Sequence, residues 1–171
     1  MKPEALTLRG RVAAMLPDNV DTDIIYPGRY LNVTDREKTP EHLFELAYPE
    51  IRGLIQPGDF IVAGKNFGCG SSREQAAAAL KFAGCGGVIA VSFARIFFRN
   101  AINLGLPAIV SATAVQLLQA GDELLIDLTA GKIQKTGAPE PIAAAPLDPR
   151  AAELLAGGGL IPYLKKKYAA A

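Results

Sequence analysis

The chain changes from a strand pattern to a helix pattern through the segment Gly64-Lys65-Asn66-Phe67-Gly68-Cys69-Gly70-Ser71-Ser72-Arg73-Glu74. The run before it, residues 59–63, is apolar after its first residue and predicts a buried strand. The run after it, residues 75–83, has helical composition and ends at Gly84. The segment is therefore a glycine-rich connection at the point where a strand ends and a helix begins.

This connection has the composition of an anion-binding turn. Its glycines allow a tight turn and a close approach to a ligand. Ser71 stands three residues before Glu74, the spacing of a capping box, so we predict Ser71 as the N-cap. Hydroxyl groups, the Arg73 guanidinium and the free amides of a helix start would then meet where the helix dipole favours negative charge. An ordinary capped turn explains the same local pattern, and both interpretations stay open.

Composition excludes several classes of function. The chain has 171 residues, half of them hydrophobic, and 18 basic against 17 acidic residues give a net charge of +1. Such a balance gives no reason to expect nucleic acid or an acidic membrane surface as partner. No apolar run approaches the roughly 20 residues that span a bilayer, and the first residues lack a signal-peptide core. We expect one cytoplasmic domain over residues 1–171.

Cysteine and histidine are scarce. The chain holds two cysteines, Cys69 and Cys85, and one histidine, His42. An iron–sulfur cluster needs about three or four thiolates, and a structural zinc usually needs four Cys or His ligands, so this chain alone supplies neither site. His42 lies in a short amphipathic pattern, which predicts a surface position.

The order of elements predicts an α/β fold. We expect strands at 6–16, 59–63, 87–92, 108–111, 123–128 and 132–135, and helices at 40–53, 75–83, 93–104, 113–120, 149–156 and 160–168. Ser92 is the expected cap of the helix at 93–104, and Gly105 its end. The alternation in the middle of the chain indicates a parallel sheet, with antiparallel strands added at both ends. Residues 139–149 form a Pro/Ala-rich connector.

Known binding and catalytic motifs match the acid-rich and glycine-rich segments poorly. Asp18, Asp21 and Asp23 resemble a calcium loop, but the glycine and closing glutamate of that pattern are missing, which leaves a solvated turn as the alternative. The glycine-rich segment fits neither a Rossmann fingerprint nor a P-loop nor a nucleophile elbow. Cys69 near a helix start is a conceivable nucleophile, although no histidine neighbours it. What remains is anion binding, with Arg73 suited to grip a carboxylate.

Four ordered motifs carry a family resemblance. They are Gly68-x-Gly70-Ser71-Ser72-Arg73-Glu74, Ser92-Phe93-Ala94-Arg95-Ile96, Asp18-Asn19-Val20-Asp21-Thr22-Asp23-Ile24-Ile25-x-Pro27-Gly28-Arg29-Tyr30-Leu31 and Arg99-Asn100-Ala101-Ile102-Asn103-x-Gly105-Leu106-Pro107. The first two resemble the swivelling domain of the aconitase superfamily. All four together resemble the separate small subunits of 3-isopropylmalate dehydratase and its relatives, over residues 8 to 110. The short chain resembles the archaeal-type form.

The resemblance implies a three-layer β/β/α swivelling domain and half of an active site. In this family a large subunit supplies three cysteines for a [4Fe-4S] cluster, so no metal ligand is expected from this chain. By matching motif, Ser71 would be the base that removes a proton next to a carboxylate, and Asp23 a second catalytic residue. Gly70, Ser72, Arg73 and Thr22 would bind the substrate, a small hydroxy di- or tricarboxylate. Cys69 replaces an acidic residue of aconitases and is expected to serve packing.

The resemblance implies that the segment Tyr30-Leu31-Asn32-Val33 determines which substrate is bound. Homoaconitase-type subunits carry an arginine after the Tyr-Leu pair, and isopropylmalate-type subunits an apolar residue. Asn32 is neither, while Val33 is apolar. Leaving a buried third carboxylate without a partner charge costs several kcal/mol. We therefore expect isopropylmalate, with 2,3-dimethylmalate and homocitrate as alternatives.

Two readings without catalysis stay open. The chain could bind carboxylates on its own, or act as a regulatory or structural partner. The Ser-Ser-Arg-Glu and Thr-Asp motifs favour the enzyme, since a scaffold does not need them. As partners we expect the large subunit and the substrate, no nucleic acid and no membrane, and an isolated chain that can self-associate.

Overall fold

The computed structural model describes residues 6–169. Its strands are β1 (Thr7–Leu16), β2 (Phe60–Ala63), β3 (Gly87–Ala90), β4 (Ala108–Val110), β5 (Glu123–Asp127), β6 (Lys132–Lys135) and β7 (Ile142–Ala143). Its α-helices are α1 (Thr22–Ile25), α2 (Ile51–Leu54), α3 (Glu74–Phe82), α4 (Arg95–Leu104), α5 (Ala112–Leu117), α6 (Pro149–Ala156) and α7 (Leu160–Ala169). Two 3₁₀ segments, η1 (Gly28–Tyr30) and η2 (Arg36–His42), complete the described elements.

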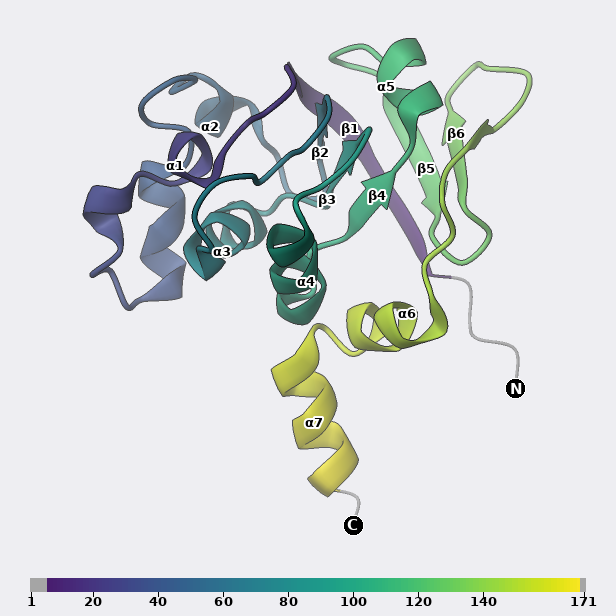
Figure 1. The fold of residues 1–171 in the computed structure, drawn as a ribbon. Coiled ribbons are helices and arrows are strands. Elements are labelled where there is room, and N and C mark those ends of the chain that lie inside the picture. Colours follow the sequence, from purple (N-terminus) through teal and green to yellow (C-terminus); the bar gives the residue numbers. More distant parts are fainter. Residues whose placement is uncertain (1–5, 170–171) are drawn as a thin grey trace.

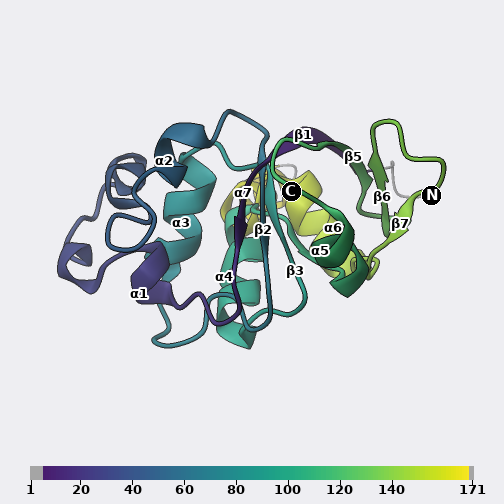
Figure 2. The same cartoon turned by 90° about the horizontal axis from the view of Figure 1, so that it is seen from above.

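The seven strands form one sheet in the order β4-β3-β2-β1-β5-β6-β7. Strands β1 to β4 pair in parallel, and β1, β5, β6 and β7 pair antiparallel. The long β1 belongs to both halves: Thr7–Arg11 pairs with β5, and Val12–Leu16 pairs with β2. The pairing is irregular between Val12 and Ala14, where the chain passes from one half to the other. The sheet curls around this strand (Figures 1 and 2).

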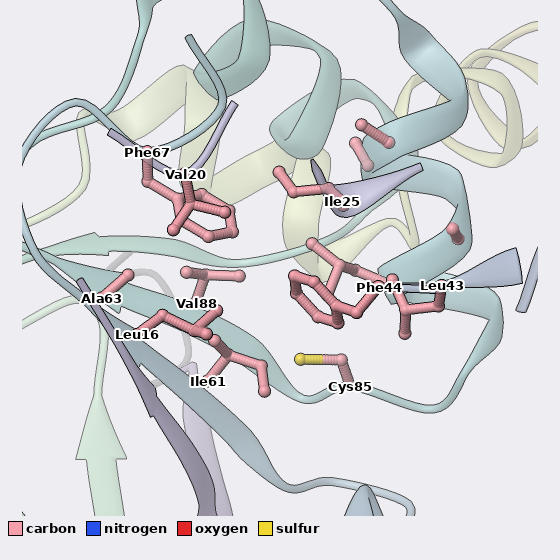
Figure 3. Close-up of a cluster of buried hydrophobic side chains, with 14 of the residues drawn as sticks. Leu16, Val20, Ile25, Leu43, Phe44, Ile61, Ala63, Phe67, Cys85 and Val88 are labelled. Atoms are coloured by element: carbon pink, nitrogen blue, oxygen red, sulfur yellow. The ribbon is translucent and has the colours of Figure 1, made fainter. Parts of the chain in front are cut away.

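Two hydrophobic clusters cover the two faces of the parallel half. In β2, Ile61 and Ala63 belong to the first cluster, whereas Phe60 and Val62 belong to the second. Successive side chains of a strand point to opposite faces, so a strand covered on both sides is apolar throughout. The first cluster lies under α3 and η2, and Figure 3 shows its interior. The second lies under α5, α6 and the antiparallel strands.

Helix α4 links the layers. It contacts α3 on one side and α6 and α7 on the other (Figure 1). Phe97 and Ala101 point into the first cluster, while Ile102 belongs to the second. Gly105 ends the helix with a φ of +77°, which confirms the predicted stop. None of the described helices has the length and apolar character needed to cross a membrane.

Most predicted elements are confirmed, including the α/β class, the hairpin of β5 and β6 and the helices α6 and α7. The predicted helix at 40–53 is wrong: only α2 is α-helical there, and η2 ends at His42. Phe44 has a left-handed φ of +55°, Pro49 lacks the amide that a continuous helix needs, and Gly53 weakens the helix further. Strand β7 was missed because it lies inside the proline-rich connector. That the whole chain is a single domain stays a prediction.

Candidate functional site

The glycine-rich segment lies at the carboxyl edge of the parallel half, where ligand sites of open α/β sheets are found. It runs beside the segment that follows β3. The Phe67 amide donates to the Ser92 carbonyl over 3.0 Å, and the Ala94 amide donates to the Phe67 carbonyl over 2.9 Å. Residues 66–68 and 92–94 are therefore joined before α3 and α4 begin.

A third segment, the acid-rich turn at 18–23, closes the site from the other side. The Gly68 amide donates to the Val20 carbonyl over 2.8 Å, and the Thr22 amide donates to the Cys69 carbonyl over 2.9 Å. The buried Thr22 hydroxyl donates to the Ser71 carbonyl over 2.9 Å. These bonds fix the backbone around Ser71 before any ligand is considered.

The predicted capping box is wrong. Helix α3 begins at Glu74, and its N-cap Arg73 makes no side-chain cap. Arg73 is extended, with φ −123° and ψ +113°, because the bonds to the acid-rich turn hold the preceding residues away from a helical path. Ser71 and Ser72 are exposed, and their hydroxyls have no hydrogen-bond partner among residues 6–169. A Ser71 hydroxyl that caps no helix is available to a ligand.

Ser92 does not cap α4 either. Helix α4 begins at Arg95, with Ala94 as N-cap and no capping side chain. The Ser92 hydroxyl instead accepts a hydrogen bond from the Asn66 amide over 2.8 Å. Ser92 thus connects two loops of the site, and the amides at the start of α4 keep free donors.

The carboxylates of the acid-rich turn satisfy nearby backbone amides. Asp18 accepts from the Lys65 amide over 2.6 Å, and Asp21 accepts from the Ile24 amide over 2.8 Å as N-cap of α1. Within the described part of the chain, no three His, Cys, Asp or Glu side chains form a group that could hold a metal ion. The turn is built by these bonds, which gives the calcium alternative no support.

Asp23 is an ion-pair partner of Arg73. Its Oδ1 accepts from Arg73 Nη1 over 2.7 Å and from the Gly28 amide over 2.7 Å. These two hydrogen bonds, the one from Arg73 first, hold the pKa of the Asp23 carboxyl below its usual value. A methyl group on Gly28 would lie 3.0 Å from Arg73 Nη2, so the guanidinium rests against a position that has no side chain. Arg73 is held in place, and part of its charge is compensated.

These segments enclose a hollow of about 250 Å³, which we call the serine hollow. It is lined by Thr22, Gly68, Gly70, Ser71, Ser72, Arg73, Ala94, Arg95, Ile96 and Phe97. Thr22, Gly70, Ser71, Ser72 and Arg73, all predicted from sequence, thus meet at one place. Asp23 is not part of the lining and reaches it only through Arg73. The first turn of α4, with Arg95, was not predicted as part of the site, although the Ser-Phe-Ala-Arg-Ile motif marks it.

The predicted specificity segment lies apart from the serine hollow. Leu31 and Val33 line a second hollow of about 230 Å³, together with Arg36, Glu74 and Ala78 among others. Neither Tyr30 nor Asn32 lines it. Arg36 and Glu74 form an ion pair across it, and Glu74 is the residue next to Arg73. The two hollows share no lining residue, but Arg73 of one and Glu74 of the other are neighbours at the start of α3.

His42, predicted as a surface residue, is partly exposed and takes part in a cluster of side chains. Its ring stacks on the Tyr30 ring with centroids 3.5 Å apart and an interplanar angle of 7°. Glu45 contacts both rings: Oε2 lies 2.9 Å from His42 Nδ1, and Oε1 accepts from the Tyr30 hydroxyl over 3.0 Å. Arg29 Nη2 also donates to Glu45 Oε1. This cluster anchors the start of the specificity segment.

The two cysteines lie in different environments. Cys69 is partly exposed but does not line the serine hollow. Cys85 is buried, its thiol donates to the Gly87 carbonyl over 3.2 Å, and burial raises the pKa of the thiol to about 11.

Comparison with known proteins identifies related chains. Residues 18–113 match the family model described as the aconitase C-terminal domain. A 3-isopropylmalate dehydratase small subunit from Moorella thermoacetica is 51% identical over 150 residues, which cover 88% of this chain and 90% of that protein. A methanogen homoaconitase small subunit from Methanothermobacter thermautotrophicus is 47% identical over 159 residues, 93% of this chain and 91% of that protein.

A solved structure has the same fold. It is the crystal structure of 3-isopropylmalate dehydratase from Methanocaldococcus jannaschii, with a TM-score of 0.87 and 43% identity. The match covers 96% of this chain and 97% of that chain. The predicted swivelling-domain fold is confirmed by this likeness together with the family match.

Proposed function

Since the chain belongs to the aconitase C-terminal domain family, we propose that it is the small subunit of a hydro-lyase that interconverts 2-isopropylmalate and 3-isopropylmalate. The reaction removes water from one isomer and adds it back with the hydroxyl group on the neighbouring carbon. The observation that carries the proposal is the serine hollow, whose lining contains both Arg73 and Ser71, and the Ser71 hydroxyl does not cap a helix. The names of relatives that align with nearly the whole chain support the proposal.

Ser71 is the proposed base. A serine hydroxyl is a poor base near pH 7, so its alkoxide must be stabilised by its surroundings. The start of α3 has no capping side chain, and its amides lie next in sequence to the exposed Ser71 and Ser72. Such amides and the Arg73 guanidinium stabilise negative charge on the serine oxygen and on the substrate. Ser71 would then remove the proton on the carbon next to a carboxylate.

Asp23 is better described as a positioning residue than as a catalytic one. Its carboxylate holds Arg73 Nη1, and the missing side chain at Gly28 leaves room for the guanidinium. Arg73 keeps other N–H groups for a substrate carboxylate, in the bidentate geometry that arginine favours. Thr22 acts similarly on the backbone, since its hydroxyl holds the Ser71 carbonyl. Gly70 and Ser72 border the same hollow and are proposed to contact the substrate.

The other half of the site would belong to a large subunit, with a [4Fe-4S] cluster there. Such a cluster, when bound, polarises the substrate hydroxyl and makes it a better leaving group. This chain's own task is to close the site, hold a carboxylate and take the proton. The relatives' designation as small subunits supports a large-subunit partner. Self-association of the isolated chain and a cytoplasmic location stay predictions.

Isopropylmalate is the favoured substrate because the second hollow presents Leu31 and Val33 beside the start of α3. An apolar substituent matches these side chains, whereas a third carboxylate would lack a partner charge there, since Arg36 is already paired with Glu74. 2,3-Dimethylmalate fits the same surface. Homocitrate is the alternative that the methanogen relative's name supports. Asn32→Arg is expected to move the ratio of kcat/KM values toward tricarboxylates, and an unchanged ratio would remove residues 30–33 from the assignment.

The test is co-expression with a candidate large subunit under anaerobic conditions, followed by alkene absorbance with each substrate. Ser71→Ala should lower kcat by about 10³-fold while the subunits still assemble. Ser72→Ala is the matched neighbour and should raise KM more than it lowers kcat. Loss of assembly by Ser71→Ala would give Ser71 a structural role instead. No turnover of any of the three substrates with an intact cluster would exclude the dehydratase and leave the carboxylate-binding and scaffold alternatives.

A further inference from the structure

Two helices, not one, begin at the serine hollow. Helix α3 starts behind Ser71 and Ser72, and the first turn of α4 supplies Ala94, Arg95, Ile96 and Phe97 to the lining. Neither helix has a side-chain cap, so both keep free amide donors at this end. The sequence pattern assigned anion chemistry to α3 alone.

The two arginines that line the hollow differ in how free they are to bind a ligand. Arg73 shares its guanidinium with Asp23 through the 2.7 Å ion pair. Arg95 is exposed, and no hydrogen bond or ion pair joins its side chain to another residue within 6–169. A substrate with two carboxylates brings two negative charges, and Arg73 paired with Asp23 does not balance both. Arg95 is the cation of the lining that has no carboxylate on it.

Arg95 is fixed relative to Ser71 by the backbone around it. The Phe67–Phe93 bridge and the bonds between residues 67 and 92–94 join the two loops immediately before α4. Below them, Phe97 fills the space that a side chain at Gly68 would need, so α4 is packed directly on the glycine-rich segment. The first turn of α4 thus belongs to the rigid frame of the hollow, and only the Arg95 side chain has freedom to meet a ligand.

We propose that Arg95 binds the substrate carboxylate that Arg73 does not hold. This inference rests on the proposed dehydratase function and adds to it a second carboxylate contact on the small subunit. Arg95, at the start of α4, and Arg73, just before α3, both line the hollow. Two cations at one hollow would favour substrates with two carboxylates over those with one.

The test compares Arg95→Gln, Arg95→Lys and the control Arg99→Gln in the assembled enzyme at saturating large subunit. Arg99 is exposed on the next turn of α4 and does not line the hollow. Loss of one charge-assisted hydrogen-bond partner should raise KM about 10-fold to 100-fold for Arg95→Gln, with a smaller change in kcat. Arg95→Lys should recover part of the loss, and Arg99→Gln should stay within about twofold of wild type.

A second measurement separates substrate binding from subunit contact. Arg95→Gln should weaken inhibition by maleate about 10-fold, and inhibition by its monoamide much less, because the monoamide lacks one carboxylate. Equal effects on both inhibitors would overturn the proposal. So would a KM increase that disappears when more large subunit is added, since Arg95 would then serve assembly. An inactive wild type would refute the proposed function itself, whereas an active wild type with a normal Arg95→Gln variant refutes this inference alone.

Discussion

Replacing Gly68 by alanine tests the frame on which the proposed site depends. Gly68 has a φ of +78°, a conformation that residues with a side chain adopt at a cost. A methyl group there would lie 2.6 Å from Cδ2 of Phe97 and closer still to its Cβ and Cγ. Phe97 is 2% exposed and makes an edge contact with Phe67, so it has no free space to move into. The substitution therefore combines backbone strain with overpacking.

The two contributions can be estimated separately. A left-handed conformation costs a residue with a Cβ about 1–2 kcal/mol, and overpacking a filled core costs typically about 1–3 kcal/mol. Gly68→Ala should thus lower the free energy of unfolding by about 2–5 kcal/mol. In a chain of this size, each kcal/mol shifts the melting temperature by about 2–4 °C, so the melting temperature should fall by roughly 4–20 °C. Gly70→Ala is the matched control, because its φ is +87° but its nearest new contact, Cβ of Asp21, lies 3.5 Å away.

Urea unfolding followed by circular dichroism measures these changes in the isolated chain, provided that the slope with denaturant is unchanged. Gly70→Ala should show the strain contribution alone, about 1–2 kcal/mol. Phe97→Ala removes Cγ and Cδ2, so in the Gly68→Ala background it should recover part of the loss, which a double-mutant cycle isolates. If both glycine variants lose the same stability, or if Phe97→Ala recovers nothing, the contact between Gly68 and Phe97 does not hold the site together.

Three further substitutions or treatments check other parts of the structure. Ser111→Ala should lower the free energy of unfolding, measured by thermal or urea denaturation, by about 1–2 kcal/mol. The reason is that the buried Ser111 hydroxyl accepts from the Ala114 amide and donates to the Ala143 carbonyl. An unchanged stability would contradict a role of these two hydrogen bonds. Under native conditions at pH 8, iodoacetamide should label the partly exposed Cys69. Burial raises the pKa of the Cys85 thiol to about 11, so Cys85 should react only in urea. Mass spectrometry that finds both cysteines labelled at similar rates would refute the buried position of Cys85. Because the hydrogen bond from Arg73 lowers the pKa of Asp23, the wild type should be more stable than Asp23→Asn above the usual carboxyl pKa of about 3.9, and that advantage should shrink as the pH falls further. Equal stability of the two proteins at neutral pH would argue against the ion pair.

Short-range patterns in the sequence were reliable where one physical effect dominates. The apolar runs of β2 and β3 predicted buried strands because only strands covered on both faces are apolar throughout. Gly105 predicted the end of α4 because a helix often ends at a residue in the left-handed conformation, which costs glycine little. The caps failed where distant segments compete for the same groups. The Ser92 hydroxyl accepts from the Asn66 amide, and the Ser71 carbonyl accepts from the Thr22 hydroxyl, so neither serine is left in a capping position.

The sequence by itself determined the α/β class, the family resemblance and half of the residues around the serine hollow. It also showed that two cysteines and one histidine supply too few ligands for an iron–sulfur cluster in this chain alone. Only the tertiary structure decided that Ser71 is free of the helix, that Asp23 holds Arg73, and that Arg95 joins the same hollow. These facts depend on contacts between residues about 20 to 50 positions apart, which no local pattern encodes. The glycine-rich segment supplies the groups, and the neighbouring turn and helix decide which of them a ligand can reach.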